Sequence, residues 1–243
     1  MLITIITTAL FAADTTNTCW QLTELGHDLP QRPVVLIVGS PGVNISAYFP
    51  WAEAIEYRGY NALLAKPAAT ISTIDQAQSG LRELVEATSS DLGAFMAVSH
   101  GYGGTLSLIA EIPATGIGLI GAPLGPHLVP TTPAPAPVVQ GLPFPTEQTG
   151  GLPTAPVTPS LSRELAGWAQ NAPAIPDPTA PVVVLASDAD VIAPPESVRL
   201  PTTDWSDRFW LREGFLSNKR SSHADLLLDT RSAIEVIRAL EGL

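Results

Sequence analysis

The sequence predicts an α/β fold in which a mostly parallel central sheet carries helices on both faces. Two observations lead to this prediction. Short, wholly apolar runs alternate along the chain with segments of helical periodicity, and a glycine cluster directly follows one of these runs. A run in which every residue is apolar is typical of a strand buried on both faces. The 243 residues, 45% of them apolar, suffice for a single domain with a large core.

The elements follow from periodicity and from the residues that end them. A run such as Val34–Val38 (VVLIV) is too short and too uniformly apolar for a surface helix. Helical spacing of apolar residues marks the segment after Thr73, and Gly59 ends the preceding helix. The expected strands are Pro33–Val38, Tyr60–Lys66, Phe95–Val98, Ile117–Gly121, Pro181–Ala186 and Arg208–Arg212, and the expected helices are Trp51–Arg58, Thr73–Thr88, Thr105–Glu111, Ser160–Asn171 and Ser232–Leu240.

Two segments depart from this alternation. Residues 123–180 are proline-rich and contain little helical pattern beyond Ser160–Asn171, which is consistent with either a surface insertion or a lid over a cleft. The run Pro133–Pro137 has the composition of a polyproline II ligand or of a plain linker. Residues 1–13 are apolar and end in small residues, but no Lys or Arg precedes them. They are either a first strand, in a cytoplasmic protein, or a signal peptide, in an exported one.

Charge and cysteine content exclude several functions. Twelve basic residues stand against 23 acidic ones, a formal net charge of −11, which would repel a phosphate backbone, so we expect no nucleic-acid partner. No stretch is long enough for an integral membrane helix. Cys19 is the only cysteine and no His-x-x-x-His pair occurs, so we expect no internal disulfide, no metal site and no cofactor.

Three separated segments then resemble the α/β-hydrolase family of esterases and lipases. The first is VVLIVGSPG, from Val34 to Gly42, which is similar to the family's third strand and the loop that follows it. In the family this loop supplies one backbone N–H to the oxyanion. The resemblance therefore implies that the N–H of Ser40 is an oxyanion donor.

The second segment, Ser99-His100-Gly101-Tyr102-Gly103-Gly104, resembles the family's nucleophile elbow, a sharp strand-to-helix turn flanked by small residues. Aligned on His100 and the glycine pair, the nucleophile position is Gly101, which offers no nucleophile, and Tyr102 would supply the second oxyanion N–H. A second register reads Ala97-x-Ser99-x-Gly101. There Ser99 is the nucleophile and His100 supplies the N–H.

The third segment, Val182–Ser197, resembles the family's acid turn, and Ser221–Leu227 resembles its histidine loop. The resemblance implies that Asp190 is the acid of a catalytic triad, with Asp188 as the alternative, and that His223 is the base. Nucleophile, acid and histidine occur in the order expected for this fold. Chemically, a serine hydroxyl needs a histidine to take its proton and a buried carboxylate to hold that histidine.

Two functions remain open from the sequence. One is a serine hydrolase of apolar carboxylic esters that acts through an acyl-enzyme on Ser99, Asp190 and His223. The other is a catalytically inactive member of the fold, with a natural or engineered Gly101 in place of the nucleophile, that binds an apolar ligand or a partner.

Overall fold

The structure is a computed structural model that describes residues 19–26, 29, 31–124, 158–171, 178–190, 193, 195, 197–198, 210–212 and 221–243. Within this part of the chain, a seven-stranded sheet has the order β1-β3-β2-β4-β5-β6-β7. β1 runs antiparallel to β3, and the other neighbouring pairs are parallel, which confirms the predicted fold class. The strands are β1 (Trp20–Glu24), β2 (Val34–Val38), β3 (Asn61–Pro67), β4 (Phe95–His100), β5 (Gly116–Ile120), β6 (Val182–Ala186) and β7 (Trp210–Arg212).

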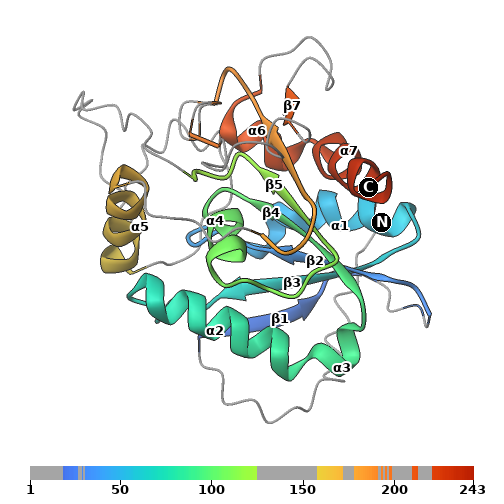
Figure 1. The fold of residues 1–243 in the computed structure, drawn as a ribbon, viewed down its shortest axis with the longest axis horizontal. Coiled ribbons are helices and arrows are strands. Elements are labelled where there is room, and N and C mark those ends of the chain that lie inside the picture. Colours follow the sequence, from blue (N-terminus) through green and yellow to red (C-terminus); the bar gives the residue numbers. More distant parts are fainter. Residues whose placement is uncertain are drawn as a thin grey trace.

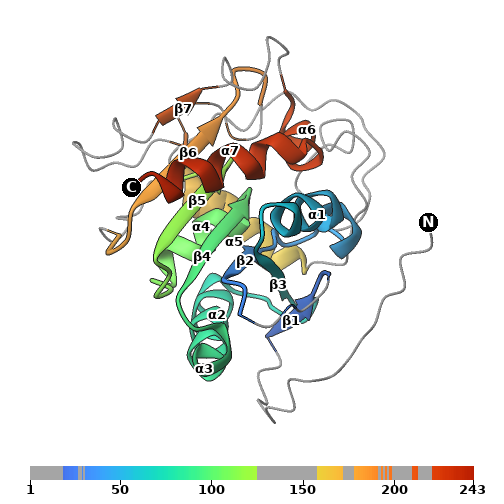
Figure 2. The ribbon, with the colours of Figure 1, turned by 90° about the vertical axis from the view of Figure 1, so that its right-hand side faces the viewer.

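Helices cover both faces of this sheet (Figure 1). α1, α6 and α7 pack on one face and α2, α4 and α5 on the other, an arrangement also visible after a 90° turn (Figure 2). The helices are η1 (a 3-10 turn, Ile45–Tyr48), α1 (Phe49–Tyr57), α2 (Ile74–Ala87), α3 (Ser89–Leu92), α4 (Tyr102–Ile109), α5 (Pro159–Asn171), α6 (His223–Leu228) and α7 (Thr230–Glu241).

Strand β2 explains why the core has two halves. All five of its residues are buried. Val34, Leu36 and Val38 pack with the α2 side, whereas Val35 and Ile37 pack with the α1 side. Successive side chains of a strand point to opposite faces, so a strand covered on both faces must be apolar at every position. The two helical layers therefore explain why the sequence of β2 is apolar without interruption.

The structure differs from the expected elements at several places, and the short helices η1 and α3 were not expected. Strand β4 continues to His100 rather than ending at Val98, and α4 begins at Tyr102 rather than Thr105. The tail contains two helices, α6 and α7, where only the second was expected. The short edge strand β1 was not expected at all; it is fixed by antiparallel pairing with β3 and by the Trp20 indole, which donates to the Ala77 carbonyl over 2.7 Å.

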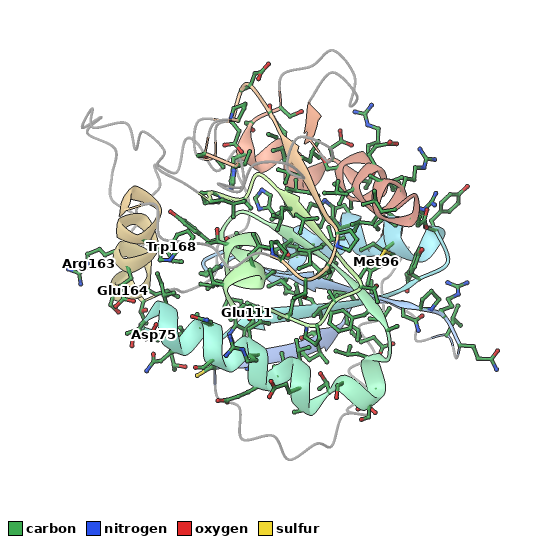
Figure 3. All side chains as sticks on the ribbon, viewed as in Figure 1. Asp75, Met96, Glu111, Arg163, Glu164 and Trp168 are labelled. Atoms are coloured by element: carbon green, nitrogen blue, oxygen red, sulfur yellow. The ribbon has the colours of Figure 1, made fainter. Side chains whose placement is uncertain are left out.

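The two ambiguous segments are only partly described. Residues 1–18, 125–157 and 172–177 lie outside the described residues, so the signal-peptide and lid alternatives stay predictions. Helix α5, within the proline-rich segment, docks beside the start of α2, where the Ile74 amide donates to Glu164 over 2.8 Å. Trp168 packs against the core on the inner side of α5 while Arg163 points outward (Figure 3).

Candidate active site

Ser40, Gly101 and Asp190 were singled out from the sequence, and they lie at one edge of the sheet together with Gly121, which was not. Ser40 follows β2, Gly101 follows β4, Gly121 follows β5 and Asp190 follows β6, and these strands are neighbours in the order β2-β4-β5-β6. The strands are parallel, so their carboxyl ends meet at the same edge. Ligands of open α/β sheets bind at this edge.

A buried acid and a histidine are joined at this edge. The Nδ1–H of His223 donates to Asp190 Oδ2 over 2.7 Å, and the Asp190 side chain is fully buried. The second carboxylate oxygen, Oδ1, accepts from the Ala193 amide at 2.8 Å. Asp188, the alternative acid, is exposed two positions earlier. With Nδ1–H held by the carboxylate, a neutral His223 carries its lone pair on Nε2.

Local sequence explains the placement of His223. It is the first residue of α6, and Ser222 caps that helix in a capping box with Asp225. In this motif the serine side chain accepts from the third helical amide while the acidic side chain accepts from the serine amide. A further hydrogen bond ties Ser187, just after β6, to the Ser221 carbonyl. The histidine is therefore anchored to the same loop region that carries Asp190.

Gly101 forms the sharp turn between β4 and α4. Its backbone has φ 55° and ψ −136°, a conformation that side-chain-bearing residues rarely adopt. The two following glycines permit the close approach of α4. A Cβ on Gly103 would lie 2.2 Å from the Val38 carbonyl oxygen, and one on Gly104 would lie 2.6 Å from the Ala122 Cβ. The glycine pair thus sets the turn at residue 101.

A side chain at position 101 would point at His223. A Cβ built on this glycine would lie 3.1 Å from His223 Nε2 and 3.2 Å from Ser40 Oγ. The turn is therefore a sharp strand-to-helix turn in which a side chain at position 101 would face His223. This placement is the one that the register aligned on Gly101 predicts, and the identity of the nucleophile stays a prediction.

Ser99 does not take part in this arrangement. It lies within β4, is fully buried, and its Oγ is 2.9 Å from the Oγ of Ser107 on α4. Because the Ser107 hydroxyl donates to the Gly103 carbonyl at 2.7 Å, the Ser99 hydroxyl is the donor of the pair. The register with Ser99 as nucleophile required β4 to end earlier, and the strand instead runs on through His100, with His100 paired to Ile120. The His100 amide accordingly belongs to the strand and not to a turn.

The predicted oxyanion donors lie in different surroundings. The Ser40 N–H donates to the Tyr48 hydroxyl at 2.7 Å, so this N–H is already paired with a side chain. The group of Ser40 that faces the Gly101 turn is its hydroxyl. Tyr102 follows Gly101 as the first residue of α4, where backbone amides have no partner within the helix. Its role as an oxyanion donor stays a prediction. Burial raises the pKa of the Tyr48 and Tyr102 hydroxyls, which keeps both protonated.

Sequence reasoning assigned His100 only a backbone role, but its ring supports His223. Its Nε2–H donates to the His223 carbonyl at 2.9 Å, and the two rings are 4.3 Å apart. Burial, followed by the proximity of His223, lowers the pKa of His100 well below its usual value, so the ring is neutral. The only signal in the sequence was a histidine at the end of a buried strand.

Among the described residues, no group of three His, Cys, Asp or Glu side chains is arranged to hold a metal ion. In the same part of the chain, none of the helices combines the length and apolarity needed to span a membrane.

Comparison with known proteins was made by sequence and by structure. No protein-family profile and no curated protein sequence matches this chain. Solved structures do match. A monoacylglycerol lipase of Paleococcus ferrophilus is 15% identical, with a TM-score of 0.59, over 92% of this chain and 99% of its own. A lipase-esterase related protein of Clostridium acetobutylicum is 11% identical, with a TM-score of 0.62, over 91% and 99%.

A third similar structure is a Bacillus licheniformis lipase in its mature form, 14% identical with a TM-score of 0.59 over 91% of this chain and 97% of its own. Identities this low bear on the fold alone. The matches extend over nearly the full length of both chains. The chain therefore has the α/β-hydrolase fold.

Proposed function

We propose that this protein hydrolyses carboxylic esters with the Asp190–His223 pair as its general base. The observation that carries the proposal is the 2.7 Å hydrogen bond between a buried carboxylate and a histidine whose Nε2 faces the elbow turn. A buried Asp190 holds the imidazole in one tautomer and stabilises the imidazolium that forms when Nε2 takes a proton. The similar solved structures include lipases, which supports an ester as the substrate class.

The nucleophile cannot be residue 101, because glycine has no hydroxyl. His223 would instead activate a hydroxyl group in the space that faces the turn, either water or a neighbouring side chain. In both cases, the proton passes to Nε2 and returns to the departing alcohol, so the base is regenerated at the end of each cycle.

The test is hydrolysis of p-nitrophenyl butyrate by the purified full chain and by Asp190→Asn. We expect activity in the unmodified protein and a loss of roughly 10³- to 10⁴-fold in Asp190→Asn, because the amide favours the wrong imidazole tautomer. Asp188→Asn is the matched control, since Asp188 is exposed and two positions away, and it should keep full activity. Equal activity in all three proteins would refute a role for Asp190.

A second function, a non-catalytic ligand-binding protein, is favoured by the absence of a side chain at Gly101. It predicts no hydrolysis by the unmodified protein and a gain of activity in Gly101→Ser. Because a Cβ there would lie 3.2 Å from Ser40 Oγ, the double variant Gly101→Ser/Ser40→Ala provides the serine with more room. Activity confined to these variants would favour this second function over the first.

A further inference from the structure

The space in front of Gly101 is bordered by polar atoms from two other segments. Measured from the position of a Cβ on this glycine, the nearest atoms are His223 Nε2 at 3.1 Å and Ser40 Oγ at 3.2 Å. The first comes from the start of α6 and the second from the loop after β2. A proton acceptor held by a buried carboxylate and an aliphatic hydroxyl therefore face the same small space.

The backbone of Ser40 is fixed on both sides. Its N–H donates to the buried Tyr48 hydroxyl at 2.7 Å, and its carbonyl accepts from the Val43 amide at 3.2 Å. Just before it, the Gly39 amide donates to the Ala65 carbonyl at 2.9 Å. Rotation about the Cα–Cβ bond is the freedom left to the hydroxyl. Ser40 is only 7% exposed, so it is a buried residue of this edge of the sheet.

Ser40 and a side chain at position 101 would compete for the same room. The carbon-to-nitrogen separation of 3.1 Å and the carbon-to-oxygen separation of 3.2 Å are shorter than ordinary van der Waals contact. A Cβ at 101 would therefore require Ser40 or His223 to move by a few tenths of an ångström. Glycine at 101 removes this conflict. The residue that lacks the usual nucleophile is thus the residue that leaves space for a hydroxyl from the neighbouring loop.

We propose that Ser40 Oγ is the nucleophile, an inference that rests on the ester hydrolysis proposed above. Oγ bonds to the ester carbonyl carbon while its proton moves to His223 Nε2. The bond from that carbon to the leaving alcohol then breaks, the alcohol takes the proton from Nε2, and the acyl group remains on Ser40. Water, deprotonated by Nε2, attacks the acyl carbon, and the carboxylic acid leaves as the proton returns to Oγ.

The test uses a fluorophosphonate probe and peptide mass spectrometry on the purified full chain. We expect a single adduct on Ser40, loss of labelling in Ser40→Ala, and a fall in p-nitrophenyl butyrate hydrolysis of at least about 10³-fold. Ser46→Ala is the matched control because Ser46 is an exposed serine in η1, the 3-10 turn that follows the Ser40 loop, and it should behave as the unmodified protein. Ser40→Cys retains a nucleophile of similar size, and its labelling by iodoacetamide should fall when His223→Ala is added.

The outcomes separate this inference from the function on which it rests. If the unmodified protein hydrolyses the ester and Ser40→Ala keeps that activity, or if the adduct lies elsewhere, Ser40 is not the nucleophile and the Asp190–His223 base can still act on water. If only Gly101→Ser hydrolyses the ester and Ser40 is unlabelled, both the hydrolase function and the role of Ser40 fail. A Ser40 adduct without ester hydrolysis would support the nucleophile and reject esters as its substrate.

Discussion

Asp190 and His223 can meet over 2.7 Å because the residue beside their hydrogen bond, Gly121, has no side chain. A Cβ on Gly121 would lie 2.9 Å from Asp190 Oδ2 and 3.2 Å from His223 Nδ1. The glycine follows β5 with φ 55°, and its amide donates to the Leu185 carbonyl at 2.9 Å, which fixes it against β6. The hydrogen bond between Asp190 and His223 therefore depends on Gly121, which follows β5 and contributes no functional group to the site.

Gly121→Ala should separate this pair. The new methyl group would push between the carboxylate and the ring, and the positive φ adds strain of about 1–3 kcal/mol. We expect ester hydrolysis to fall by at least about tenfold, the effect of a loss near 1.4 kcal/mol in transition-state stabilisation. The low-field proton NMR signal of the His223 Nδ1–H should shift or disappear. An unchanged signal would mean that the structure accommodates the methyl group without separating Asp190 from His223.

Gly101→Ala should lower stability more than the same change at Gly93. The two glycines have nearly the same backbone, φ 55° and ψ −136° against φ 59° and ψ −144°. A Cβ on Gly93 meets nothing within 4 Å, whereas one on Gly101 meets His223 and Ser40. Both variants carry the conformational strain, so the difference in their free energies of unfolding isolates the crowding. Urea denaturation of the three proteins measures it, and equal losses would show that the space at Gly101 accepts a methyl group freely.

Ser99→Ala should affect stability but not hydrolysis. The substitution removes a buried hydroxyl that donates to Ser107, which we expect to lower the free energy of unfolding by about 0.5–1.5 kcal/mol. Thermal denaturation and p-nitrophenyl butyrate hydrolysis, measured on the same preparation, separate the two effects. A folded Ser99→Ala protein without activity would instead support Ser99 as the nucleophile and contradict the register aligned on Gly101.

His100 should make the protein less stable in acid. Its pKa is lowered in the folded state by burial and by His223, so below about pH 6.5 the unfolded chain binds a proton that the folded chain does not. The free energy of unfolding then decreases as pH falls, by up to about 1.4 kcal/mol per pH unit for this group.

His100→Gln is the comparison, because glutamine keeps an Nε2–H donor for the His223 carbonyl and does not titrate. Urea denaturation between pH 7 and pH 5 should give a smaller loss of stability in this variant than in the unmodified protein. Parallel curves for the two proteins would assign the acid sensitivity to other groups.

Local patterns in the sequence determined the fold class, and the resemblance to the α/β-hydrolases implied the acid and histidine candidates. The five apolar residues of β2 predicted a strand covered on both faces, and the serine-rich turn before α6 placed His223 at a helix start. These features depend on periodicity and capping, which act over a few residues. Tertiary structure alone decided the rest. The length of β4 depends on pairing with its neighbours, and that pairing assigned the turn to Gly101 and buried Ser99.

The dependence on tertiary packing also explains why the functional group of Ser40 was predicted differently from the sequence. The sequence predicted its backbone N–H as the functional group, whereas the structure pairs that N–H with Tyr48 and points the hydroxyl at the turn. Contacts between Ser40, Gly101 and His223 join segments far apart in the chain. They exist because the strand order places β2 beside β4 and because packing fixes the loops at their ends. No local sequence pattern predicts these contacts, because they depend on the packing of the whole sheet and not on any one segment.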